Sequence, residues 1–393
     1  MKRTSVLVQP NRMCVFLANI LTILAMLLAT SFSARADGHL FVDDIEENAS
    51  KIDPRTGKPL FELKPTWLTP TSAVHEDMLK ESFNLSNIYN RVWDDRATAN
   101  SDETSYIKGV YWNDSPERGL CRWCPFPDNN MRAFEWYTRF KAAESAADKG
   151  AIFTHASPIL ERSHFGDLVF MHGMASGNGF PPAETQRLML IWAEFTYKVA
   201  TGKISGLTKI RDVKIESFSD VFNAQDTDVY DRDMRALFSD PHDATMFIDV
   251  RRIAMGSLLH LIEDSYSPAH VQRVYLDTAE GRFCRGAIRQ FLAYTSQNVQ
   301  KHSAGDKWPA NLPRNALTPD ARVCDPITAG AAVLKFYARD DFTGADWAEV
   351  RTFFEKSIFA LDANAIASGP GEDFKKGARY PPDGRVFVRF WRR

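Results

Sequence analysis

Residues 256–270, which read GSLLHLIEDSYSPAH, place a histidine and an aspartate inside an apolar segment with helical spacing. His260 and Asp264 are four residues apart, so in a helix their side chains lie close together on one face. Leucine and isoleucine residues surround the pair on nearly every side, and the helix is therefore expected to be buried. An imidazole and a carboxylate are costly to bury unless they pair with each other or bind a metal ion.

A second histidine follows this helix closely. Pro268 cannot continue the helical hydrogen bonds, so the chain is expected to bend there and to return His270 toward the pair. A hydrogen bond within a core would explain His260 and Asp264 alone. The spacing His260-x3-Asp264-x5-His270 instead favours a metal site.

Other histidine and aspartate residues add to this pattern. His302 and Asp306 repeat the four-residue spacing, and the spacing of His164, Asp167 and His172 is roughly that of one helical face. Each of these residues alone is more typical of a solvated or hydrogen-bonded side chain. Together they form a set of ligand types that suits zinc. The further members of the set are His75, His164, His302 and Asp306.

The N-terminal segment resembles a secretory signal peptide. Basic residues precede an apolar run over 13–29, and Ala-Arg-Ala at 34–36 provides a cleavage site. We expect cleavage after Ala36 and export to the periplasm or beyond the cell, with an uncleaved membrane anchor as the alternative. No later run is long enough to span a bilayer.

Four cysteines follow the predicted signal peptide, and an even number in an exported chain indicates disulfides. They are Cys121, Cys124, Cys284 and Cys324, which allow three pairings. The spacing Cys121-x2-Cys124 is also found in zinc ribbons and redox motifs. No second C-x2-C is present, so structural disulfides are the preferred interpretation.

Hydrophobic periodicity predicts an all-α protein with a single multi-helix domain over 67–362. An N-terminal arm (37–66) precedes this domain, and a C-terminal tail (363–393) follows it. The tail ends in alternating basic and apolar residues, which predict either an interfacial membrane contact or an edge strand. Residues 84–129 read as irregular. Helical patterns occupy 72–83, 131–148, 182–202, 228–238, 243–265, 286–302, 328–338 and 345–361.

The central motif, with its proline two residues before the last histidine, resembles the zinc-dependent phospholipase C and single-strand nuclease superfamily. It is most similar to the zinc metallophospholipases C that bacteria export. Ser-His-Phe at 163–165 looks like the segment that supplies another histidine ligand in that family. The resemblance covers about 67–306 and implies the all-α fold of these enzymes.

The resemblance implies two or three zinc ions. The implied ligands are His164, His260 and Asp264 for the first ion, His270, His302 and Asp306 for the second, and His75 with a bridging Asp264 for the third. Two departures affect the last two ions. The family completes its third site with an N-terminal tryptophan, but cleavage here leaves Asp37 first, and Trp67 is internal. The family has glutamate where this chain has Asp306.

The resemblance also implies a carboxylate that guides the attacking water. Asp148, at the end of a predicted helix and upstream of His164, is the first candidate, although an ordinary helix-end role is equally compatible with its position. Asp167 and Glu144 are the alternatives. His172 is expected to orient a metal ligand through a hydrogen bond.

The function that the resemblance implies is hydrolysis of phospholipids to diacylglycerol and a phosphorylated headgroup, with a membrane surface as partner. A nuclease or phosphodiesterase would use the same metals. The whole chain carries 48 basic and 50 acidic residues, and loss of the four basic residues in 1–36 makes its net charge about −6. This charge disfavours a nucleic-acid partner. A non-enzymatic, zinc-stabilised lipid-binding protein is the third interpretation.

Overall fold

The predicted all-α class is correct for most of the described chain, which also contains one two-stranded antiparallel sheet. The predicted signal peptide, the N-terminal arm, Trp67, Cys121, Cys124 and the alternating end of the tail lie outside the described residues. The computed structural model describes residues 74–88, 102–114, 116, 129–227, 229–238, 249–278, 281–295, 297–309, 311–312 and 322–376.

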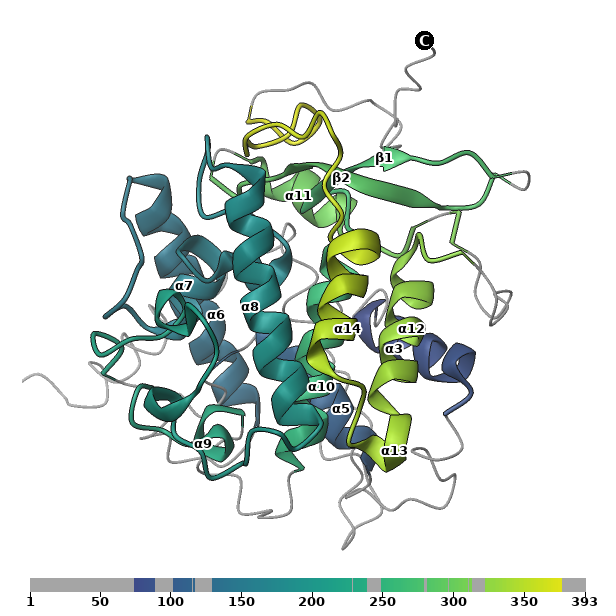
Figure 1. Cartoon of the computed structure of the whole chain (residues 1–393). Coiled ribbons are helices and arrows are strands. Elements are labelled where there is room, and N and C mark those ends of the chain that lie inside the picture. The colour runs from purple at the N-terminus through teal and green to yellow at the C-terminus, as the bar shows by residue number, and fades with distance from the viewer. Residues whose placement is uncertain are drawn as a thin grey trace, which may run out of the picture.

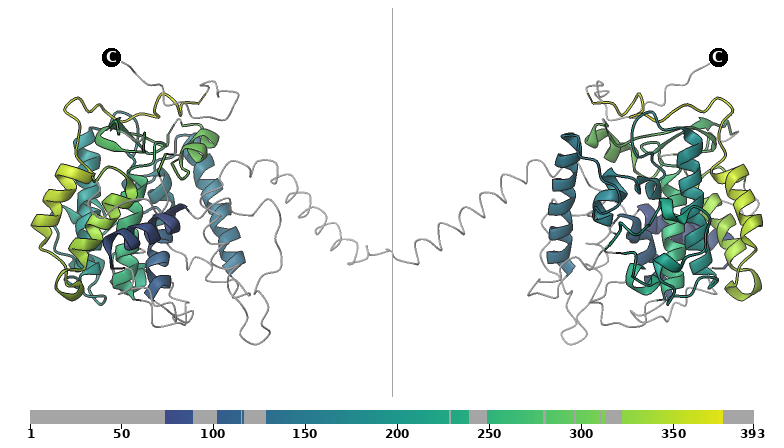
Figure 2. Two further views of the ribbon diagram at one scale, coloured as in Figure 1. Left: turned by 90° about the vertical axis from the view of Figure 1, so that its right-hand side faces the viewer. Right: turned by 60° about the vertical axis from the view of Figure 1, so that its left-hand side comes forward.

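Helices form the body of the molecule, while the sheet and α11 lie together at one end (Figure 1). Figure 2 shows α6 at an outer side of the body. The main elements are α3 (Val74–Ser86), α5 (Asp102–Asp114), α6 (Asn129–Asp148), α7 (Ile159–Phe165), α8 (Pro182–Ala200), α9 (Met234–Phe238), α10 (Val250–Asp264), β1 (Val271–Tyr275), β2 (Arg285–Phe291), α11 (Val299–Gly305), α12 (Pro326–Tyr337), α13 (Arg339–Phe342) and α14 (Trp347–Phe353). Shorter turns are the 3-10 helices η2 (Val169–His172), η3 (Ile210–Asp212) and η4 (Phe218–Asp220), and the π-helical turn η5 (Phe354–Ile358).

Helix α10 is the central helix of the fold. The side chain of Asp249 caps its N-terminus by accepting a hydrogen bond from the backbone N–H of Arg251. Helices α3, α5, α8 and α12 all pack against it, so nearly every side chain of α10 is buried. The burial predicted from the leucines and isoleucines around His260 is therefore confirmed.

Two glycines allow α5 and α10 to cross with their backbones in contact. A Cβ atom on Gly256 would lie 2.2 Å from the carbonyl oxygen of Tyr106, and one on Gly109 would lie 2.1 Å from that of Ile253. No side chain fits at these separations, so both positions require glycine. The close crossing brings Asp114, the last residue of α5, within 3.6 Å of His260 Nε2.

We expect Gly256→Ala to lower the free energy of unfolding by about 3 kcal/mol, because the added methyl group must push α5 away from α10. The same displacement should move Asp114 away from His260, since Asp114 lies at the end of α5. Chemical denaturation measures the change in stability. Gly177→Ala is the matched control, because its Cβ would meet nothing closer than 3.6 Å. Equal stability of the two variants would contradict the prediction.

The helix predicted over 286–302 is wrong, because this stretch contains most of β2 and the first part of α11. Strand β2 pairs with β1 in an antiparallel register that shifts twice, each time with an extra residue on β2. These bulges break the two-residue alternation of a strand. The buried residues Ile288 and Phe291 are consequently three positions apart, a spacing that imitates a helix.

A disulfide joins Cys284 to Cys324, 40 residues apart in the sequence. One of the three predicted pairings contains this bond. The same pairing would join Cys121 to Cys124, and both of these cysteines lie outside the described residues. Disulfides are typical of oxidising compartments, in agreement with the expected export. Among the described helices, none combines the length and the apolar character needed to cross a membrane.

Candidate metal centre

The two residues of the predicted α10 pair lie together in the core. His260 Nε2 is 2.9 Å from Asp264 Oδ2, and both side chains are almost fully buried. After α10 the chain turns as predicted from Pro268, so that His270 Nδ1 lies 3.5 Å from the same carboxylate oxygen. The structure therefore brings all three residues of the motif around Asp264.

Two residues from other elements complete what we call the first cluster, defined as Asp114, His172, His260 and Asp264. His172, at the end of η2, places Nδ1 2.8 Å from Asp264 Oδ2 and 3.2 Å from His260 Nε2. The Asp114 Oδ1 atom lies 3.7 Å from His172 Nδ1 and 3.6 Å from His260 Nε2. Three helical elements thus converge on one point.

His164 lies beside His172 but not on one helical face with it. Helix α7 ends at Phe165, so His164, Asp167 and His172 do not share one helical face. The His164 Nδ1–H donates to the carbonyl oxygen of Leu160 at 3.0 Å, and its ring centre lies 5.1 Å from that of His172. Potential ligand atoms of His164, Asp114 and His172 lie close to one another. Those of His172, His260 and Asp264 form a second such group, so His172 belongs to both.

The second cluster consists of His270, His302 and Asp306, the three residues assigned to the second zinc. The two imidazoles face each other with their Nε2 atoms 3.3 Å apart, and Asp306 Oδ2 is 3.4 Å from His270 Nε2. The Asn298 side chain caps α11, the helix that carries His302. Spacing in the sequence predicted the pair of His302 and Asp306, and the family resemblance implied their grouping with His270.

His75 approaches the carboxylate of Asp264 from the opposite side. Its Nε2 atom lies 3.6 Å from Asp264 Oδ1, and its ring stacks on that of His260 with centres 4.3 Å apart. Glu263 Oε2 accepts a hydrogen bond from His75 Nδ1 at 2.9 Å. His75 and His172 therefore lie next to different oxygens of the Asp264 carboxylate.

The residues fit a metal ion, because their unprotonated atoms face one another. His172 Nε2–H donates to the carbonyl oxygen of Asn113 at 3.1 Å, which leaves Nδ1 as an acceptor opposite the acceptor Asp264 Oδ2. Such contacts repel unless a cation or proton lies between them. Asp264 Oδ1 is buried and receives no hydrogen bond from the described residues. Nitrogen and carboxylate oxygen are the donors that zinc prefers besides thiolate.

In the absence of metal, protons compensate the negative charge of the clusters. Burial lowers the pKa of His260, but the carboxylates of Asp264 and Asp114 raise it, to about 9 overall. Burial also lowers the pKa of His270, but the carboxylates of Asp306 and Asp264 raise it, again to about 9 overall. Burial raises the pKa of Asp264, but the neighbouring imidazoles hold it well below its ordinary value.

His164 behaves in the opposite way. Burial, followed by repulsion from His172, lowers its pKa to about 3, so this imidazole is neutral at physiological pH. A neutral ring with Nδ1–H held by the Leu160 carbonyl leaves the acceptor position at Nε2. His164 is therefore ready to act as a ligand or as a hydrogen-bond acceptor beside the first cluster.

The two carboxylates predicted to guide a water molecule occupy different surroundings. Asp148 is at the end of α6, and its Oδ1 atom is 2.5 Å from the ammonium group of Lys376. Asp167 accepts two hydrogen bonds from the buried guanidinium group of Arg162, at 2.7 and 3.0 Å. Both carboxylates thus belong to ion pairs, but only Asp148 also lines the pocket described next.

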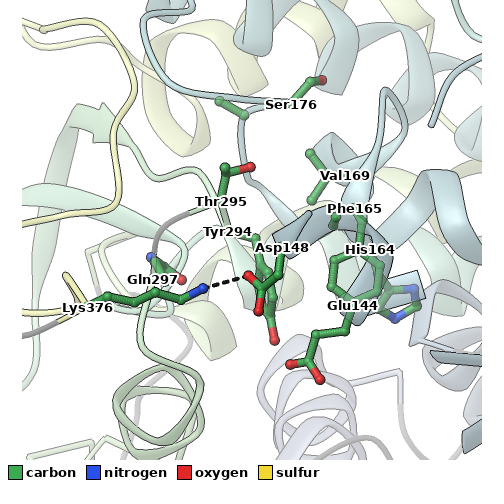
Figure 3. A pocket seen from close by; sticks show the side chains of 12 residues that line it. Glu144, Asp148, His164, Phe165, Val169, Ser176, Tyr294, Thr295, Gln297 and Lys376 are labelled. Atoms are coloured by element: carbon green, nitrogen blue, oxygen red, sulfur yellow. Dashed lines mark hydrogen bonds and ion pairs between the residues drawn. The ribbon is translucent and has the colours of Figure 1, made fainter. Parts of the chain in front are cut away.

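A pocket of about 130 Å³ is lined by neighbours of the two clusters, and not by the cluster residues themselves (Figure 3). His164 lines it beside the first cluster, and Gln297, which contacts His302, lines it beside the second. Burial and the carboxylates of Glu144 and Asp148 raise the pKa of Tyr294, another residue of its wall. Its remaining wall includes Phe165, Ser176, Thr295 and Lys376.

Sequence analysis missed Asp114 as a ligand candidate and gave His172 only a supporting role. Asp114 ends α5, a helix that lies within the region predicted to be irregular. The apolar spacing of Tyr106, Val110 and Tyr111 was the available signal for that helix, because these residues form its buried face. Spacing alone did not show that His172 contacts both His260 and Asp264.

Comparisons with known proteins provide no family assignment. No protein-family model matches the chain, and neither the curated proteins nor the solved structures contain a match. The structure itself shows a mostly helical protein whose buried histidine and aspartate clusters could hold metal ions.

Proposed function

We propose that the protein is a zinc-dependent phosphodiester hydrolase of the phospholipase C type. The observation that carries this proposal is the sharing of Asp264 between two adjacent histidine clusters beside a pocket. Neighbouring metal ions that share a carboxylate suit in-line displacement at phosphorus, because the attacking and leaving oxygens are stabilised together. The sequence resemblance to zinc phospholipases C independently supports this choice of chemistry.

Hydrogen bonds within the protein orient the side chains that would bind zinc. Zinc, when bound, supplies positive charge that polarises a phosphodiester and acidifies water. The carbonyl of Asn113 fixes the tautomer of His172, and the carboxylate of Glu263 does the same for His75. Asp148 is the proposed residue for guiding the attacking water, because it lines the pocket and Asp167 does not.

The pocket favours a substrate whose headgroup carries a positive charge. Glu144 accepts a hydrogen bond from Lys141 through Oε2, while its buried Oε1 receives none from the described residues. The rings of Phe165 and Tyr294 pack edge to face in the same wall, with centres 5.3 Å apart. Aromatic faces and a carboxylate together attract ammonium groups.

Glu144→Gln is expected to raise the KM for a phosphodiester with a choline headgroup about 10-fold, because one charge interaction with the ammonium group is lost. The KM for a substrate with an uncharged headgroup should stay within twofold. Steady-state hydrolysis of both substrates measures the difference. Glu194→Gln is the control, because Glu194 pairs with Lys198 on α8. An equal effect on both substrates would show that Glu144 does not recognise charge.

The decisive experiment combines metal analysis with hydrolysis by one preparation of the mature protein. Bound zinc together with cleavage of a choline phosphodiester supports the proposal. Cleavage of single-stranded DNA alone would assign the protein to the nucleases of the same superfamily. Stoichiometric zinc without turnover of either substrate would identify a zinc-stabilised binding protein. Absence of bound zinc would exclude all three.

A further inference from the structure

The buried amide of Gln297 connects the segments that carry the second cluster. Its Nε2 atom donates to the carbonyl oxygens of Ala269 and Pro370, both at 3.0 Å. Its Oε1 atom lies 2.8 Å from His302 Nδ1. Since a carbonyl oxygen only accepts hydrogen bonds, the two carbonyls fix the orientation of the amide, and its oxygen must face His302.

This orientation determines the tautomer of His302. An amide oxygen only accepts, so His302 Nδ1 must carry the proton that it receives. The Nε2 atom is then an acceptor, and it points toward His270 Nε2 at 3.3 Å. Ala269 immediately precedes His270, so the same amide holds the backbone beside one imidazole and the ring of the other.

We propose that Gln297 is a positioning residue for the second cluster. It keeps His302 in the tautomer that presents Nε2 to a metal ion, and it fixes the rotation of the ring. This inference rests on the proposed function, in that the second cluster must bind zinc. Hydrogen bonds of this kind to metal-binding histidines raise metal affinity about 10-fold to 100-fold.

Gln297 has a second role that must be separated from positioning. Its two donated hydrogen bonds attach the segment around Pro370 to the turn before His270, and they stabilise the fold whether or not metal is present. Only the accepted hydrogen bond acts on His302. Variants that keep the acceptor but lose the donor therefore distinguish the two roles.

The test compares Gln297→Met with Gln297→Glu in the mature protein. Methionine has a similar volume and removes all three hydrogen bonds, whereas glutamate keeps an acceptor opposite His302 but loses the amide donor. Gln290→Met is the matched control, because Gln290 Nε2 donates to the carbonyl of Ala367 in the same C-terminal segment and has no hydrogen bond with an imidazole among the described residues. Zinc competition with a chelating dye gives the stoichiometry and the Kd of each ion.

We expect Gln297→Met to weaken one zinc ion by about 10-fold to 100-fold and to leave the other binding unchanged. Gln297→Glu should retain that ion to within a few-fold, as should Gln290→Met. The visible spectrum of the cobalt-substituted protein should change only for Gln297→Met. If Met and Glu weaken zinc equally, or if neither does, the positioning role is overturned. A wild-type protein without zinc would instead overturn the proposed function, and the inference with it.

Discussion

Replacing Asp264 with asparagine is expected to release zinc from both clusters and to reduce hydrolysis by more than about 1,000-fold. The carboxylate contacts ligands of both clusters. Its Oδ2 atom lies 2.8 Å from His172 Nδ1, 2.9 Å from His260 Nε2 and 3.5 Å from His270 Nδ1. Removal of a shared ligand should cost more than the roughly 10-fold to 100-fold that loss of an outer hydrogen-bond partner costs.

The reason for the large effect is charge rather than shape. Asparagine has nearly the same volume as aspartate, so the packing around α10 is retained. The amide carries no negative charge, and its NH₂ group would point a donor toward imidazole nitrogens or toward the metal. Without the carboxylate, divalent cations in this buried space lose part of the charge that compensates them.

Zinc stoichiometry and turnover of a choline phosphodiester measure the outcome. Asp325→Asn is a matched control, because Asp325 is also buried but caps α12 through a hydrogen bond from the backbone N–H of Thr328. Asparagine is an equally good capping residue, so this variant should keep both its fold and its metal. Retention of two zinc ions by folded Asp264→Asn would refute the bridging arrangement.

The parts of the site that the sequence predicted are those encoded locally. His260 and Asp264 are about one helical turn apart, so their side chains lie next to each other in any helix that contains both. Pro268 forces a turn soon afterwards, so the return of His270 follows from the same short stretch. The pairing of His302 with Asp306 likewise depends on four-residue spacing.

The parts that the sequence did not predict depend on contacts between distant segments. Asp114 reaches the first cluster because Gly109 and Gly256 let the backbones of α5 and α10 come into contact. The sequence around either glycine does not indicate this helix crossing. The role of His172 depends on Gly166, which ends α7 and separates His172 from His164. A Cβ on Gly166 would lie 2.2 Å from the carbonyl of Phe153, a contact that no local pattern reveals.

The strand error has a related cause. A strand is predicted from alternation, and the two bulges of β2 remove that alternation. The buried apolar residues of β2 are consequently spaced as in a helix. The segment nevertheless forms a strand because it pairs with β1, and such a tertiary contact can outweigh the local sequence pattern.

Zinc binding at pH 7.5 is expected to release about two protons per protein molecule, because metal must displace the proton of each charged imidazole. The pKa values of His260 and His270 are raised to about 9 in the metal-free protein, so both rings are protonated at this pH. The pKa of His164 is lowered to about 3, so this ring contributes none. Calorimetric titrations in buffers of different ionisation enthalpy give the number of protons released.

The same pKa values predict that the stability of the protein depends on pH differently with and without zinc. A pKa that is raised from about 6.5 in the unfolded chain to about 9 in the folded protein stabilises the fold fully below pH 6.5. This contribution is lost as pH rises to 9, so the Tm of the metal-free protein should fall over that range. Zinc affinity should rise over the same range as protons leave, so the zinc-loaded protein should keep its Tm. Parallel profiles for the two forms would mean that zinc does not bind at these histidines.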